Sequence, residues 1–188
     1  LTELPLTRLF CLLQELRAAA EVGPNLEQKD SQGRTVLHRA AERGDTHRVQ
    51  LLLDAGSQVN AEDHDGRTPL RLAAHERRQD ACRALLAAGA RPDVKSRPSG
   101  RTALHVAAYR GHRAVCELLL AAGARPNEPD DAIQWTALHR AAWFGRAPVV
   151  QLLLQHGAER GARDRQGRTA LDLARHRGHT AVAAMLQG

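Results

Sequence analysis

The feature that most constrains this chain of 188 residues is a motif that returns every 33 or 34 residues. A short segment that begins with threonine and has leucine at its third position occurs five times, at Thr35, Thr68, Thr102, Thr136 and Thr169. A second marker keeps the same interval, because a glycine follows an apolar run at Gly56, Gly89, Gly123 and Gly157. An interval of this length predicts a stacked repeat architecture.

Each unit predicts two short helices. Thr68 suits the N-cap of the first helix, and Pro69 suits its first position, where a missing N–H costs nothing. A small pair such as Ala107-Ala108 lets neighbouring helices approach closely, and a glycine such as Gly111 ends the helix. An apolar run such as 149–154 forms the second helix, and a polar Asp-x-x-Gly segment predicts a tight turn. Since two helices of ~8 residues cannot bury their apolar face alone, the units must stack.

Composition agrees with an all-α fold. Aromatic residues make up only 3% of the chain, so the core must consist of Leu, Ala and Val, which suit packed helices better than a β-sandwich. The apolar runs are too short to span a membrane. Three cysteines, Cys11, Cys82 and Cys116, without paired spacing favour a reducing compartment. We therefore expect the protein in the cytoplasm, the nucleus or both.

The motifs together resemble the ankyrin repeat. The pattern is Asp-x-x-Gly-x-Thr-Pro-Leu-His-x-Ala-Ala, then Gly-His, then Val-x-Leu-Leu-Leu-x-x-Gly-Ala. The resemblance implies an all-α solenoid of helix-turn-helix units joined by β-turn or hairpin loops. Its five repeats would span about 30–62, 63–96, 97–130, 131–163 and 164–188. Its concave face would consist of first helices and loop tips.

Several positions depart from the repeat pattern. Arg71 and Asp172 replace the histidine of the motif in repeats two and five, and Arg77 replaces a helix-ending glycine. Repeat three opens with Arg97 and has no Asp turn, and Gln134 stands for the turn glycine of repeat four.

Residues 1–29 do not match a full repeat. Leucines recur there with a helical rhythm, and Leu26 lies 33 residues before Val59. We expect a capping helix or degenerate half repeat that covers the open side of repeat one. The alternative is an amphipathic helix that binds a partner.

The sequence predicts no catalytic, cofactor-binding or metal-binding residues. His38, His105 and His139 share one slot of the repeat, so they would lie about a repeat apart, too far for a common zinc ion. The resemblance implies that this histidine belongs to the hydrogen-bond network around the Thr turn, and we interpret His112 and His179 as structural too. Cys82 and Cys116 take a slot held elsewhere by valine, which indicates small buried hydrophobic side chains.

The resemblance also implies the positions that contact a partner, namely the loop tips and the two residues after Ala-Ala. Four of the five aromatic residues of the chain fall there, three of them in repeat four. We expect these positions to face solvent, and exposed aromatic rings beside arginine are typical of interface hot spots. The alternative is that Trp143 and Phe144 pack on one another or beneath the fourth loop. The predicted protein-binding residues are Arg67, His75, Arg101, Tyr109, Arg110, Ile133, Trp135, Trp143, Phe144, Arg168, Arg175 and His176.

Arginines occupy one loop-tip slot in four repeats, at Arg34, Arg67, Arg101 and Arg168, and would form a basic row. We predict a monomeric, non-catalytic module whose concave groove binds a protein or peptide with acidic residues and an apolar anchor. A lesser possibility is that the arginines partly pair with Glu42, Asp65 and Glu76. The resemblance also places Asn60 and Asn127 where asparagine hydroxylation is known in the family.

Two other functions remain open. The formal net charge of +6 and the arginine row allow binding of nucleic acid, which the near absence of lysine and the interspersed acidic residues disfavour. The chain would also suit a regulatory or scaffolding segment of a larger multidomain protein. No constellation of residues supports an enzyme.

Overall fold

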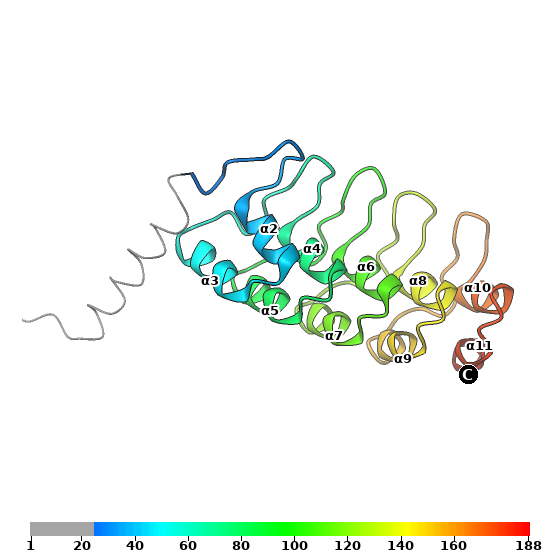
Figure 1. The fold of residues 1–188 in the computed structure, drawn as a ribbon. Helices are drawn as coiled ribbons and strands as arrows, with labels where there is room; N and C mark the ends of the chain where they lie inside the picture. The colour runs from blue at the N-terminus through cyan, green and yellow to red at the C-terminus, as the bar shows by residue number, and fades with distance from the viewer. Residues whose placement is uncertain (1–24) are drawn as a thin grey trace, which may run out of the picture.

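The computed structural model describes residues 25–188 as an array of paired helices without strands (Figure 1). Each pair consists of a first and a second helix in direct succession along the chain. The pairs are α2 (Val36–Arg43) with α3 (Thr46–Asp54), α4 (Pro69–His75) with α5 (Gln79–Ala87), α6 (Ala103–Arg110) with α7 (Arg113–Ala121), α8 (Ala137–Trp143) with α9 (Ala147–Gln155), and α10 (Ala170–His176) with α11 (Thr180–Gln187). The all-α fold is as predicted.

The helices form two layers. The first helices α2, α4, α6, α8 and α10 pack side by side in chain order, and the second helices do the same beneath them (Figure 1). Alanine pairs such as Ala107-Ala108 are fully buried between neighbouring first helices, as the small-residue pattern predicts. Each pair therefore buries its apolar face against the next pair along the array.

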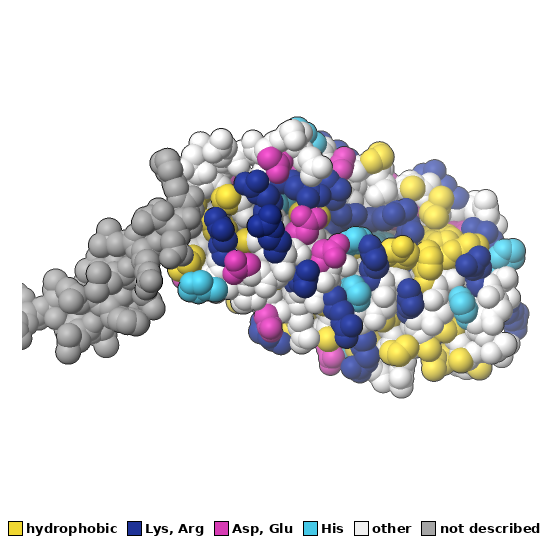
Figure 2. Space-filling model, in the orientation of Figure 1, with side chains coloured by type: hydrophobic (Ala, Val, Ile, Leu, Met, Phe, Trp, Pro, Cys, Tyr) yellow, Lys and Arg dark blue, Asp and Glu magenta, His cyan; other side chains and the backbone are white. Residues whose placement is uncertain are grey.

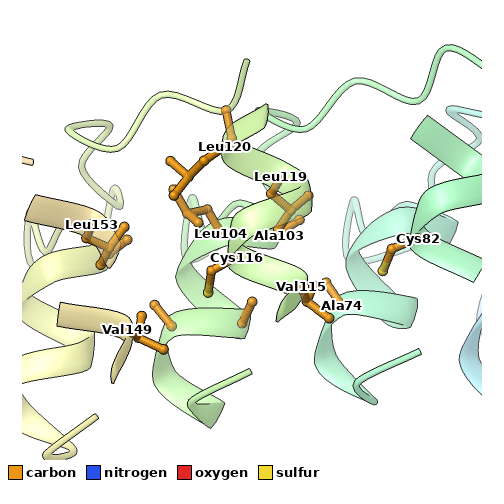
Figure 3. Packing of buried hydrophobic residues seen from close by; sticks show 14 of the residues in the cluster. Ala74, Cys82, Ala103, Leu104, Val115, Cys116, Leu119, Leu120, Val149 and Leu153 are labelled. Carbon is orange, nitrogen blue, oxygen red and sulfur yellow. The ribbon is translucent and has the colours of Figure 1, made fainter. Parts of the chain in front are cut away.

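Aliphatic side chains fill the space between the layers. One leucine of each first helix is almost fully buried, and Leu104 is an example. Cys82 and Cys116 are buried free thiols among these side chains, as Figure 3 shows, which confirms that they are small core residues. Burial raises the pKa of both thiols to about 12, so neither is a reactive thiolate at neutral pH.

A threonine and a histidine cap the N-terminus of three first helices. In α6, the Thr102 N–H donates to His105 Nδ1 at 3.2 Å, and the Thr102 hydroxyl lies 2.9 Å from the same nitrogen. Since Nδ1 accepts, we assign the proton to Nε2, which donates to the carbonyl oxygen of Trp135 at 2.9 Å. The ring thus ties one repeat to the loop of the next, and His38 and His139 do the same.

These histidines are structural, as predicted. Burial lowers the pKa of all three and brings that of His105 to about 4, so they stay neutral at physiological pH. His112 and His179 also bridge repeats, because their Nε2 atoms bond to the carbonyl oxygens of His75 and Trp143.

The loops between helix pairs project to one side as a row of fingers (Figure 1). One backbone hydrogen bond joins each finger to the next; for example, the Asp131 N–H donates to the Ser99 carbonyl at 3.1 Å. Two departures from the motif keep the backbone conformation of the glycine they replace. Arg77 has φ of 59° and Gln134 has φ of 61°, in the left-handed region that favours glycine.

Most of the predicted half repeat, including Cys11, lies outside the described residues. Of the described part, Leu26 packs against the core, and the Glu27 carboxylate accepts the Gln58 N–H at 2.9 Å. Residues 25–29 therefore lie against the first repeat. Within residues 25–188, no helix is long and apolar enough to cross a membrane.

Candidate protein-binding surface

Trp135 is buried, which corrects the prediction that it faces solvent. Only 5% of its surface is exposed, and its indole N–H donates to Asp164 Oδ2 at 3.0 Å. The Arg140 guanidinium lies over its ring, 5.1 Å from the centroid. Trp135 therefore sits between its own repeat and the loop of the next, and it supports the surface from beneath.

Three other aromatic side chains are half-buried where first helices end. Tyr109 lies in the last turn of α6 beside Phe144, and the two rings meet edge to face with centroids 4.5 Å apart. Trp143, at the end of α8, stacks on the His176 ring at 5.7 Å and contacts Trp135 at 5.5 Å. We call Tyr109, Trp143, Phe144 and His176 the aromatic surface.

Figure 2 shows a hydrophobic patch in the region of α8, bordered by arginine, lysine and histidine side chains. Trp143 and Phe144 do not cover each other, because Phe144 pairs with Tyr109 and Trp143 stacks on His176. The other form of the alternative holds in part, since Trp143 contacts Trp135 at the end of the fourth loop. The aromatic surface thus runs across three repeats.

Cations stand beside these rings. Arg110 lies over the Tyr109 ring at 5.5 Å, and its Nη2 is 2.7 Å from His75 Nε2. Arg177 lies over the Trp143 ring at 4.8 Å. The sequence predictions missed Arg177 and Arg140. Arg177 follows the recognition slots directly, and Arg140 lies in the middle of a first helix, where the motif assigns no contact.

Most of the predicted basic row is neutralised within the chain, which corrects its expected charge. Arg34 pairs with Glu42 at 3.0 Å, and Arg67 pairs with Asp65 at 2.9 Å, as the lesser possibility foresaw. Two buried aspartates, which the prediction did not foresee, also neutralise arginines of the row. Asp63 accepts a hydrogen bond from Arg67, and Asp164 accepts one from Arg168. Glu76 pairs with His75 rather than with an arginine.

The pKa of Asp164 shows that this carboxylate is stabilised in its charged form beside Arg168. Burial would raise the pKa of this carboxyl, but hydrogen bonds from Arg168 and Trp135 outweigh burial and lower the pKa to about 2. Asp164 is therefore ionised at neutral pH, and Arg168 adds little free charge to the surface.

The remaining predicted residues differ in exposure. Arg110, Arg175 and His176 are exposed, and Ile133 is 38% exposed at the tip of the fourth finger. Arg101 is half-buried, and its Nε is buried without a hydrogen-bond partner. The structure thus gathers Tyr109 and Phe144 with Arg110 and His75, and Trp143 with His176, but it leaves Ile133 and Arg175 apart from these contacts.

Asn60 and Asn127 each bridge two repeats. The Asn127 amide donates to the Gly157 carbonyl at 3.0 Å and accepts the Glu159 N–H at 2.9 Å, and Asn60 makes equivalent bonds to Gly89 and Arg91. Both side-chain amides therefore hold consecutive loops together.

The part of the chain that the structure describes contains no group of three or more His, Cys, Asp or Glu side chains that could hold a metal ion. Each conspicuous histidine and cysteine already has a structural partner or a place in the core. The most distinctive chemistry on the accessible surface is a set of aromatic rings with cations beside them.

Comparison with known families agrees with this architecture. The family model for ankyrin repeats, described as three copies, matches residues 8–96, 88–164 and 128–188. The chain belongs to the ankyrin-repeat family. Ankyrin repeats generally serve as protein–protein interaction modules and are generally not enzymes. No curated protein sequence matches the chain.

Proposed function

We propose that this protein is a non-catalytic binding module whose partner, a protein or peptide, docks on the aromatic surface. The supporting observation is that Tyr109, Trp143 and Phe144 stay half-buried at the ends of first helices, although the core is filled by aliphatic side chains. Large rings held in place by neighbours lose little entropy on binding, which is typical of hot spots.

The surroundings define the partner's chemistry. Arg110 and Arg175 are exposed at the ends of α6 and α10, so acidic residues of the partner would face them while an apolar side chain contacts the rings. The proposed module acts as a monomer, in the cytoplasm or nucleus, where the free thiols Cys82 and Cys116 stay reduced. Ile133, Arg168 and His75 would lie at the rim of the interface.

Truncation of Trp143 tests the proposal. A protein captured from cell extract by the wild type is purified and titrated against Trp143→Ala by calorimetry. We expect a loss of about 2 kcal/mol or more in binding free energy, because the ring is the largest accessible apolar group of the surface. Circular dichroism should show an unchanged helix content, since Trp143 is only half-buried.

Met185→Ala is the matched control. Met185 is 39% exposed on α11, in the other helix layer, so its loss should leave the affinity unchanged. Equal affinities of wild type and Trp143→Ala would contradict the proposal. Tighter binding of duplex DNA or RNA than of any protein, with a steep dependence on salt, would favour the nucleic-acid alternative instead.

A further inference from the structure

The third finger lacks the carboxylate that neutralises its neighbours. Four fingers begin with an aspartate, and in the second and fifth the carboxylate accepts the Nε–H of a finger arginine, as Asp63 does from Arg67 at 2.8 Å. Ser96 takes this position in the third finger. Its hydroxyl donates to the Arg101 carbonyl at 3.0 Å, so it offers no negative charge to the Arg101 guanidinium.

Arg71 adds a second cation at the same place. It occupies the slot in which the histidines of other repeats reach the next finger, as His38 reaches the Arg67 carbonyl at 3.0 Å. By the same repeat geometry we infer that Arg71 points toward the third finger, and the charge of Arg101 acts on Arg71, so the two side chains are near each other. Burial lowers the pKa of Arg71 to about 10, with further lowering from the charges of Arg67 and Arg101, so the side chain is still protonated at neutral pH.

Neither guanidinium forms an ion pair within residues 25–188, although the charges of Asp63 and Asp65 act on Arg71 from a distance. The Nε atoms of both Arg71 and Arg101 are buried without a hydrogen-bond partner, and neither side chain forms an ion pair there. The nearby carboxylates are already engaged: Asp63 and Asp65 bind Arg67, and Asp130 binds Arg140. A partly buried pair of like charges without a directly bonded counter-charge is costly unless an anion from outside joins it.

This pair adjoins the aromatic surface. Burial lowers the pKa of Arg140, and both Arg101 and Tyr109 are near enough to influence it, so the three side chains lie in one neighbourhood. In Figure 2 basic side chains border the hydrophobic patch on the side of the earlier repeats. A group bound between Arg71 and Arg101 would therefore lie beside the position expected for the partner's apolar anchor.

We propose that Arg71 and Arg101 bind the phosphate of a phosphorylated residue in the partner polypeptide. A phosphate carries close to two negative charges at neutral pH, which balances two guanidinium groups, whereas a carboxylate would leave one of them uncompensated. The planar guanidinium groups also supply the paired N–H donors that phosphate oxygens accept. This inference rests on the proposed function and specifies one chemical group of the partner.

The test follows the Nε–H signals of the arginines by NMR while inorganic phosphate, or acetate at equal ionic strength, is added. We expect phosphate to shift the signals of Arg71 and Arg101 in a saturable way and acetate to shift them much less. A capped peptide with one phosphoserine between alanines should shift them as well, and its unphosphorylated twin should not. Shifts by inorganic phosphate alone would overturn the assignment to a polypeptide.

Two variants remove the site in different ways. Ser96→Asp restores the carboxylate of the other fingers, and Arg71→His restores the residue of three other repeats, so each follows a pattern that the fold already contains. Both should weaken phosphate binding about tenfold or more. Arg43→Gln, which removes one exposed charge from α2, should leave phosphate binding unchanged.

The outcomes separate this inference from the proposed function. Equal shifts of all exposed arginine signals, or unchanged phosphate binding in both variants, would contradict the phosphate site. If the Trp143→Ala variant still loses its partner in that case, the proposed function stands and only the inference fails.

Discussion

At the scale of single residues, the threonine–histidine pairs link stability to pH. The pKa of His105 falls from 6.5 to about 4 on folding, chiefly because the ring is buried. Between these values the unfolded chain binds more protons than the folded chain, so stability is full above pH 6.5 and falls as pH drops toward 4. His105 alone accounts for about 3 kcal/mol over this window.

His105→Gln checks this dependence. Urea unfolding of wild type and variant between pH 4 and pH 7 should show a flatter pH profile for the variant, because one buried imidazole no longer titrates. Parallel profiles would mean that the His105 ring is solvated in the folded protein.

Trp135 shows where residue patterns are insufficient. Its slot is a loop-tip position, and the motif predicts exposure there, yet the ring is covered and bonded to Asp164, 29 residues further along the chain. The indole donates to the aspartate of the next finger, whereas Arg67 and Arg168 in the same slot bind the aspartates of their own fingers.

Trp135→Ala should destabilise the fold by about 3–5 kcal/mol, because it opens a cavity and removes a hydrogen bond from buried Asp164. Chemical denaturation measures the loss, with Trp143→Ala as the half-buried comparison. A Trp135→Ala variant as stable as wild type would contradict the burial of this ring.

At the scale of elements, the residue that ends a first helix keeps a left-handed backbone conformation even where it is not the glycine of the motif. Arg77 keeps a positive φ of 59° at the position that glycine holds in other repeats, for instance Gly178 with φ of 72°. Backbone strain is therefore stored at the end of α4 but not at the end of α10.

A reciprocal pair of variants measures this strain. Arg77→Gly should stabilise the protein by about 0.5–1 kcal/mol, because the Arg77 side chain is exposed and glycine accepts the conformation freely. Gly178→Ala, where an added Cβ would meet no atom within 4 Å, should destabilise it by a similar amount through φ alone. Thermal unfolding reports both, and shifts of the opposite sign would refute the assigned backbone conformations.

At the scale of the whole molecule, the repeat interval predicted most of the architecture. It did so because each helix pair depends on its neighbours: the motif residues Leu104, Ala107 and His105 all contribute to contacts between repeats. The same dependence limits what the pattern predicts of the surface. Asp63 neutralises Arg67 because the two side chains meet within one finger, whereas Ser96 offers no charge to Arg101. The positions of the arginines alone therefore overestimate the basic charge of the surface.

The two tryptophans of the chain allow a direct test of the binding surface. The indole N–H signals of both are followed by NMR as the captured partner is added. We predict that the Trp143 signal shifts and saturates with the partner, whereas the Trp135 signal, already bonded to Asp164, changes far less. Saturation of the complex with an unchanged Trp143 signal would show that the partner binds elsewhere and would contradict the account.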